Sequence, residues 1–172
     1  MMNQQVKHCS GFTFIELLVV LALFVLLATL TIVVVRPRDS LVARSYLCSL
    51  RATLHALRQR AVATARPHQL VFNTSSRTYR YANTTYTLPS GVVFGALPGV
   101  KGPPSRPKVE ISNSITFAGH KVLFKKDGTM NSGCIYVTDN RANRSYALSC
   151  PVGEISSLRL YQWCSDRWES LS

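Results

Sequence analysis

An apolar stretch near the start of the chain contains the residues with the clearest chemical meaning. Residues 12–35 include neither proline nor glycine, and Glu16 is their only charged side chain. A carboxylate inside such a run costs about 2.5–3.5 kcal/mol on membrane-insertion scales, so it is usually retained for a partner. Gly11 directly precedes the run, and the short polar segment before it carries the basic Lys7. The pattern indicates an apolar helix with a small residue at its entrance and one acid that needs a counter-charge.

Two interpretations of this segment compete. In the first it is a plain signal anchor, and the Glu16 side chain reaches back to the interface. In the second it is a processing signal, because Gly11 is followed by the aromatic Phe12 and then Thr13, and Glu16 is the fifth residue after the glycine. This register resembles the cleavage and methylation motif of type IV pilins and type II secretion pseudopilins. We favour the second interpretation, because glycine, an aromatic residue, threonine and glutamate in this register before a leucine-rich run make a specific match, and no small-residue A-x-A site of an ordinary secretory signal follows.

The resemblance implies how the segment is used. A prepilin peptidase/methyltransferase would cut between Gly11 and Phe12 and methylate the new Phe12 amine. The apolar helix would then pack with those of other pseudopilins or pilins in a filament, and the Glu16 carboxylate would pair with the Phe12 amine of a neighbour. A buried ion pair of this kind is better attested as a device for setting register than as a source of stability.

A long helix and a set of short strands are expected around this segment. As a helix, the apolar run would extend about 36 Å, enough to cross a hydrocarbon core of about 30 Å. A second helix, amphipathic with its arginines mainly on a solvated face, is expected from Leu41 to Arg66. Its apolar stripe consists of Leu47, Leu50, Leu54, Leu57 and Ala61. Pro67 follows as a helix stop.

Beyond Pro67 the pattern changes to short strands separated by turn residues. The expected strands are Gln69–Phe72, Thr78–Tyr81, Thr85–Leu88, Val92–Phe94, Ser114–Phe117, Val122–Phe124, Cys134–Thr138, Ser145–Ser149 and Leu158–Trp163. A loop without apolar pattern is expected from Gly99 to Pro107.

The predicted fold class is α+β and pilin-like, with a long N-terminal helix (a membrane span, then an amphipathic half) packed on an antiparallel β domain. We divide the chain into a cleaved leader (1–11), a transmembrane or filament-core helix (12–35), its periplasmic continuation (36–66) and a globular β domain (67–172).

The remaining reactive side chains do not form a catalytic or metal-binding pattern. The four histidines are dispersed along the sequence, and the carboxylates show no acid–base pairing. A phosphate-binding G-x-x-x-x-G-K-[ST] loop is absent from the sequence. We therefore expect neither an enzyme nor a cofactor nor a metal.

The cysteines indicate an oxidising compartment. Cys9 would leave with the leader, and the other four are Cys48, Cys134, Cys150 and Cys164. An even number in a secreted domain suggests up to two disulfides, and three pairings remain open. Their spacing lacks the paired signatures of zinc sites.

The chain is strongly basic, with 20 Lys and Arg against 8 Asp and Glu and a net charge of +12. Such a balance suits a polyanion, an acidic protein or an anionic membrane surface. Residues proposed for a sequence-indifferent DNA contact are Lys125, Lys126, Arg141, Arg144 and Arg159, the last of which is near Trp163 and Trp168 in the sequence. The favoured alternative is a solvated surface with both tryptophans as packing residues.

Two further segments narrow the resemblance. Leu54 to Phe72 and Phe124 to Asp139 resemble the H-type minor pseudopilins of type II secretion and their T-type fimbrial relatives. This implies a structural subunit that joins or primes a pseudopilus, anchored once in the inner membrane with its globular domain in the periplasm. Its partners would be the prepilin peptidase, other pseudopilins and membrane lipid. The alternative is a minor type IV pilin that acts in pilus assembly or DNA uptake.

Overall fold

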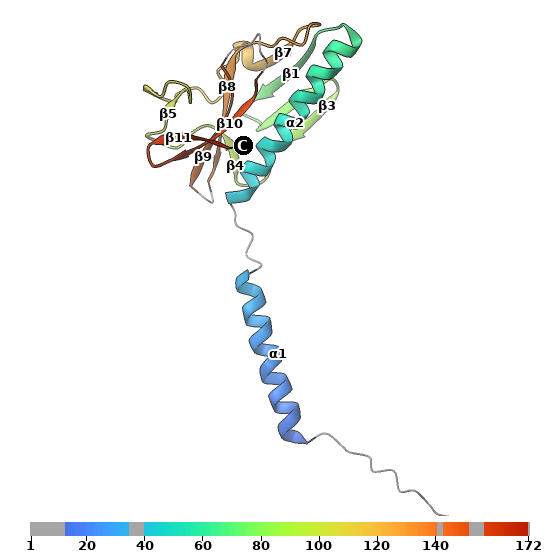
Figure 1. Cartoon of the computed structure of the whole chain (residues 1–172), viewed down its shortest axis with the longest axis vertical. Helices are drawn as coiled ribbons and strands as arrows, with labels where there is room; N and C mark the ends of the chain where they lie inside the picture. Colours follow the sequence, from blue (N-terminus) through green and yellow to red (C-terminus); the bar gives the residue numbers. More distant parts are fainter. Residues whose placement is uncertain (1–12, 35–39, 141–142, 152–156, 172) are drawn as a thin grey trace, which may run out of the picture. The chain divides into compact units, whose positions relative to one another are not determined.

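The computed structural model of the chain describes residues 13–34, 40–140, 143–151 and 157–171. By its internal contacts the chain divides into two compact units, Met1–Pro37 and Arg38–Ser172. The first unit contains the helix α1 (Phe14–Val34), and the second begins with the helix α2 (Ser40–Thr64) and continues into strands (Figure 1).

The described strands of the second unit are antiparallel and fall into three sheets. Their bounds are β1 (His68–Asn73), β2 (Thr78–Tyr81), β3 (Thr84–Thr87), β4 (Val92–Phe94), β5 (Lys101–Gly102), β6 (Val109–Glu110), β7 (Lys121–Phe124), β8 (Gly133–Asp139), β9 (Arg144–Cys150), β10 (Arg159–Cys164) and β11 (Arg167–Leu171). The four-stranded sheet has the order β3-β2-β1-β7, and the five-stranded sheet has the order β11-β10-β9-β8-β4. The third sheet is the pair β5-β6.

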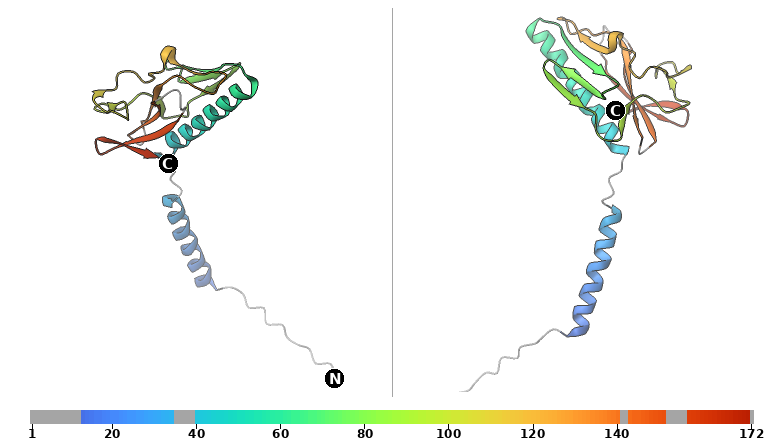
Figure 2. Two further views of the ribbon diagram at one scale, coloured as in Figure 1. Left: turned by 45° about the horizontal axis from the view of Figure 1, so that its top comes forward. Right: turned by 180° about the vertical axis from the view of Figure 1, so that it is seen from behind.

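The helix α2 covers the core side of both larger sheets (Figure 2). It contacts β1 and β7 of the four-stranded sheet and β8 and β9 of the five-stranded sheet. The predicted apolar stripe faces this core, because its members Leu47, Leu50, Leu54, Leu57 and Ala61 are all at most 3% exposed. Each buried leucine contributes about 1.5–3 kcal/mol relative to an exposed one, so this stripe is a main attachment of the helix.

α2 ends in a left-handed residue, Ala65, which has a φ of 51°. The Ala65 N–H donates to the Val62 carbonyl at 3.2 Å, and the Arg66 N–H donates to the Ala61 carbonyl at 3.3 Å. These two bonds form a Schellman motif, in which glycine usually occupies the left-handed position. The helix therefore stops at Thr64 and not at the predicted Arg66.

The main core lies between α2 and the inner faces of the two larger sheets. Leu70 of β1, Phe124 of β7 and Leu148 of β9 are fully buried there. A second, smaller cluster occupies the opposite face of the five-stranded sheet. Its buried members are Cys134, Tyr136 and Ala147. The five-stranded sheet is thus covered on both faces.

The α+β class and the antiparallel sheets are confirmed, whereas one strand was placed wrongly and three short ones were missed. Residues Ser114–Phe117 form only an isolated bridge between Ile115 and Ile135. After Phe117 the backbone turns into a 3-10 helix, Ala118–His120, which prevents further pairing. The strands β5, β6 and β11 were not predicted.

Candidate functional site

The first turn of α1 is closed by its own side chains at Thr13 and Glu16. The Thr13 backbone N–H and hydroxyl both donate to Glu16 Oε2, at 2.9 and 3.0 Å. In return the Glu16 N–H donates to the Thr13 hydroxyl at 3.3 Å. This reciprocal arrangement is a capping box, which satisfies backbone donors that a helix start leaves without partners.

The capping box fixes where the carboxylate lies. The two hydrogen bonds donated by Thr13 both end on Oε2 of Glu16, and this carboxylate lies at the positive end of the helix dipole. Thr13 is the second residue after the predicted cleavage site, so the charge is held within one turn of it. Gly11 and Phe12 themselves lie outside the described residues.

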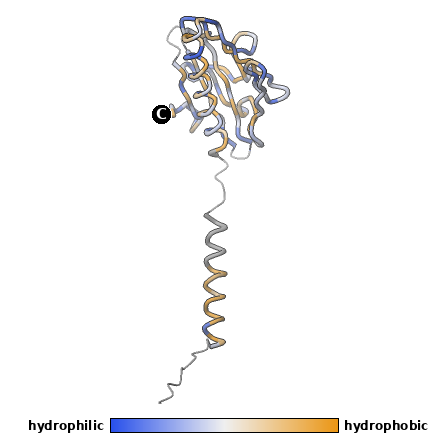
Figure 3. The backbone as a smooth tube through the Cα atoms, turned by 90° about the vertical axis from the view of Figure 1, so that its right-hand side faces the viewer, coloured by the Kyte–Doolittle hydropathy of each residue, from blue (hydrophilic) through white to orange (hydrophobic). Residues whose placement is uncertain are grey.

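The rest of α1 presents apolar side chains to its surroundings. Phe14 and Ile15 are 77% and 72% exposed, and Phe24 is 66% exposed. Figure 3 shows the predominantly hydrophobic character of the described part of this helix. Large apolar surfaces of this kind mark sites of association. Among the described residues, no helix combines the length and the hydropathy required to cross a membrane.

The basic residues proposed for DNA do not form one site. Arg144 is the first residue of β9 and pairs with Asp139 of β8, whereas Arg159 of β10 pairs with Ser149 near the other end of β9. Five residues of strand separate these pairs, which is about 17 Å. The alternation of side chains also places the two arginines on opposite faces of the sheet. Arg141 lies outside the described residues.

Lys125 and Lys126 belong to a different surface, the turn after β7. Gly128 in this turn has a φ of 80°, and a Cβ there would come within 2.9 Å of the Val62 side chain of α2. The Arg58 Nε donates to the Gly128 carbonyl at 3.2 Å. The turn is therefore docked on the helix, and Arg58 is half-buried, an exception to the mainly solvated arginines expected of this helix.

The docked turn adds positive charge to a helix face that is already basic. The pKa of His55 lies below its ordinary value, mainly through partial burial and further through the charges of Arg51 and Arg58. Lys125 and Lys126 are both exposed beside this face. The aromatic partners expected of a nucleic-acid site lie elsewhere: Trp163 of β10 and Trp168 of β11 are half-buried, and their ring centroids are 5.2 Å apart.

The described cysteines are not joined to one another. Cys134 and Cys150 occupy neighbouring cross-strand pairs of β8 and β9, so their side chains point to opposite faces of the sheet. Cys48, Cys134 and Cys164 are free thiols. Burial raises the pKa of the Cys134 thiol, which makes it unreactive. Among the four described cysteines, the structure thus contains neither of the disulfides that their number allows.

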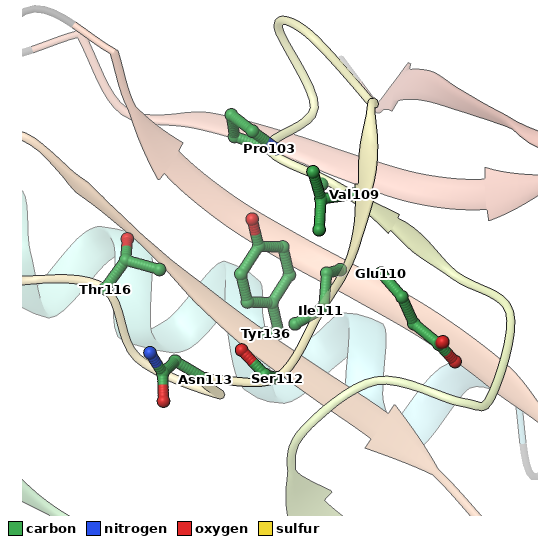
Figure 4. A pocket seen from close by; sticks show the side chains of 9 residues that line it. Pro103, Val109, Glu110, Ile111, Ser112, Asn113, Thr116 and Tyr136 are labelled. Atoms are coloured by element: carbon green, nitrogen blue, oxygen red, sulfur yellow. The ribbon is translucent and has the colours of Figure 1, made fainter.

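A cavity of about 290 Å³ lies between Tyr136 of β8 and the loop that carries β5 and β6. Figure 4 shows the Tyr136 ring in the middle of its lining side chains. Burial raises the pKa of the Tyr136 hydroxyl, and the Glu110 carboxylate accepts the Gly99 N–H at 2.8 Å. Its described lining includes no histidine, cysteine or lysine. These residues do not pair a nucleophile with a base.

The T-x-x-E spacing of Thr13 and Glu16 was a signal that sequence reasoning missed. A threonine followed three residues later by a glutamate, at the start of an apolar run, is by itself the signature of a capping box. The docking of the 125–128 turn left no comparable signal, because it depends on a contact between residues about 70 positions apart.

Comparison with known proteins identifies the N-terminal segment. The family model for the prokaryotic N-terminal methylation motif matches residues 6–32. This is the prepilin-type motif of pilin-like proteins, a class that includes type IV pilins and pseudopilins, and it implies processing by a prepilin peptidase and assembly with other pilins. No curated protein and no solved structure matches the chain.

Proposed function

We propose that the protein is a minor pseudopilin of a type II protein secretion system, a structural subunit that is incorporated into the pseudopilus or primes its assembly. The methylation motif together with the exposed apolar helix α1 carries this proposal. Pseudopilins need such a helix twice, first for a membrane and then for the filament core. The resemblance of Leu54–Phe72 and Phe124–Asp139 to H-type minor pseudopilins supports the choice within the class.

In this proposal each part of the chain has one task. The leader to Gly11 is removed, the Phe12 amine is methylated, and α1 anchors the protein once in the inner membrane with the second unit in the periplasm. In the filament, Glu16 pairs with the Phe12 amine of a neighbour. The second unit acts by its surface and not by catalysis.

Processing is tested by mass spectrometry of the protein isolated from membranes. The mature chain should begin at Phe12 and carry one methyl group on its amine. Gly11→Trp should keep the leader, because the peptidase requires a small residue there, whereas the matched control Gly11→Ala should still be cut. A mature protein that begins at Met1 or beyond residue 30 would refute the prepilin interpretation.

The secretion role is tested in a strain from which the gene is deleted. Secreted enzymes should accumulate in the periplasm, and the wild-type gene should restore their export while Gly11→Trp should not. The alternative, a minor type IV pilin, is supported by the net charge of +12 and the exposed Lys125 and Lys126. Normal secretion together with loss of surface pili or of DNA uptake would favour that alternative.

A further inference from the structure

The strand β3 forms an open edge of the four-stranded sheet, on the margin of the second unit (Figure 1). All four of its residues, Thr84 to Thr87, are exposed. It contains no charged residue, proline or glycine, although charges and prolines are the usual means by which proteins protect such edges. In a chain with a net charge of +12, an uncharged edge strand is unusual. The sequence of β3 therefore permits pairing with another strand.

The ladder between β2 and β3 determines which backbone groups face outward. Tyr79 is paired with Tyr86, and one step outside the strand the Leu88 N–H donates to the Arg77 carbonyl at 2.9 Å. In an antiparallel ladder, hydrogen-bonded and non-bonded pairs alternate. Since the Arg77–Leu88 pair is bonded, the Tyr79–Tyr86 pair is bonded too. The N–H and C=O groups of Thr85 and Thr87 consequently point away from the sheet.

A row of three aromatic side chains, Tyr46, Tyr79 and Tyr86, runs from α2 to this edge and ends there. The Tyr86 ring stacks on Tyr79, with centroids 5.0 Å apart and planes at 13°, and Tyr79 lies 6.4 Å from Tyr46 of α2. Tyr86 ends the row and is 43% exposed. Aromatic pairs directly across two strands stabilise a sheet, so a tyrosine on an added strand would continue the row.

We propose that β3 pairs antiparallel with β3 of a second copy of this chain, with the two Tyr86 residues opposite each other on a two-fold axis. In this register Thr85 of each copy lies opposite Thr87 of the other, and both outward-facing pairs become hydrogen-bonded. The edge is self-complementary in its backbone groups, its threonines and its aromatic ring. This property, and the lack of any charge that would select a charged partner, favours a second copy over a different protein.

A hollow at the end of the strand lies where the second copy would reach. It has a volume of about 470 Å³ and is lined by Val42, Tyr46 and Pro89 among others. Continuing the register places Asn83 of the second copy opposite Pro89, so its β2–β3 hairpin would border the hollow. The Tyr46 hydroxyl there is buried and has no hydrogen-bond partner among the described residues.

The proposal is independent of the secretion role and is tested with the full chain in membranes. Cys48→Ser and Cys164→Ser remove the partly exposed thiols, and Tyr86→Cys is then compared with Thr84→Cys. Opposed Cα atoms of a non-bonded antiparallel pair lie about 4.5 Å apart, within the range of a disulfide. The two copies of residue 84 would be about 13 Å apart and too distant to join. Mild oxidation should give about tenfold more disulfide-linked dimer with the cysteine at 86.

A second comparison keeps the Tyr86 ring in place. Thr85→Lys with Thr87→Lys puts like charges directly opposite each other and should weaken the dimer in detergent about tenfold, measured by sedimentation. The matched control, Gln59→Lys with Ser75→Lys, adds the same charge at exposed positions away from β3 and should leave the dimer intact. Dimerisation of the wild type should strengthen with salt, because salt screens the repulsion of two basic copies. Equal cross-linking at 84 and 86, cross-linking of residue 86 to another protein, or equal effects of both lysine pairs would overturn the proposal.

Discussion

The Glu16 carboxylate already has a role within its own helix, and any role in a filament must be compatible with it. The carboxylate caps the helix by accepting the Thr13 N–H and hydroxyl. In the proposed filament the same carboxylate faces the methylated amine of a neighbouring subunit. These roles do not conflict, because a carboxylate has about four acceptor positions, Thr13 occupies two, and the protonated methylated amine adds at most two donors. The cap would hold the charge at the helix start, ready for the neighbour.

The two roles of Glu16 can be separated by substitution. Glu16→Gln keeps the capping box, since glutamine also fits its third position, but it removes the charge. Thr13→Ala keeps the charge and removes a cap of about 0.5–2 kcal/mol. We expect Glu16→Gln to reach the membrane at the wild-type level and to be lost from sheared filaments, whereas Thr13→Ala should be retained in them. Immunoblots of both fractions measure this. Wild-type incorporation of Glu16→Gln would mean that the residue serves only as a cap.

At the scale of elements, periodic patterns predicted most of the second unit. The stripe of α2 was found because its one buried face imposes a period of 3.6, whereas β8 and β9, buried on both faces, were found as short apolar runs between turn residues. The strand β11 was missed because Arg167–Leu171 has no buried residue and is held in place by its pairing with β10. The turn before it uses Ser165 and Asp166 at positive φ, where sequence rules expect glycine or asparagine.

The candidate site was predictable only where it is local. Gly11, Phe12 and Glu16 are close in sequence, and all three lie within the matched residues 6–32. The basic residues are different, because whether two arginines on separate strands share a face depends on strand register. No pattern within β9 or β10 alone indicates that Arg144 and Arg159 lie on opposite faces and at opposite ends.

The end of α2 offers a test of element stability. Ala65 occupies a left-handed position that costs a non-glycine residue about 1–2 kcal/mol. Glycine avoids this cost, but its greater freedom in the unfolded chain lowers the free energy of unfolding by about 0.4–1 kcal/mol. Ala65→Gly should therefore raise the free energy of unfolding by about 0.5–1 kcal/mol in urea titrations. The control Ala56→Gly, exposed and in mid-helix, should lower it by about 1 kcal/mol. A loss of stability in both variants would contradict the Schellman geometry.

At the scale of the whole molecule, the positive charge is the property most open to a functional interpretation. A net charge of +12 is expected to give weak, salt-sensitive binding to any polyanion. Binding alone therefore does not separate a DNA-uptake pilin from a pseudopilin with a basic surface. What separates them is whether the affinity depends on particular side chains. The structure divides the described members of this set between the docked turn (Lys125 and Lys126) and two distant points of the five-stranded sheet (Arg144 and Arg159), which suggests diffuse charge.

Two pairs of substitutions with equal loss of charge decide between these alternatives. Lys125→Gln with Lys126→Gln neutralises the turn, whereas Arg144→Gln with Arg159→Gln neutralises two distant points of the five-stranded sheet. All four side chains are exposed, so neither pair should disturb folding. If the charge is diffuse, both pairs should weaken binding to a duplex equally and flatten the dependence of log K on log salt by similar amounts, at most about one unit per lost phosphate contact. Fluorescence anisotropy across a salt series measures both quantities. A selective loss with the lysine pair would instead locate a DNA site on the turn beside Arg58 and would favour the minor type IV pilin.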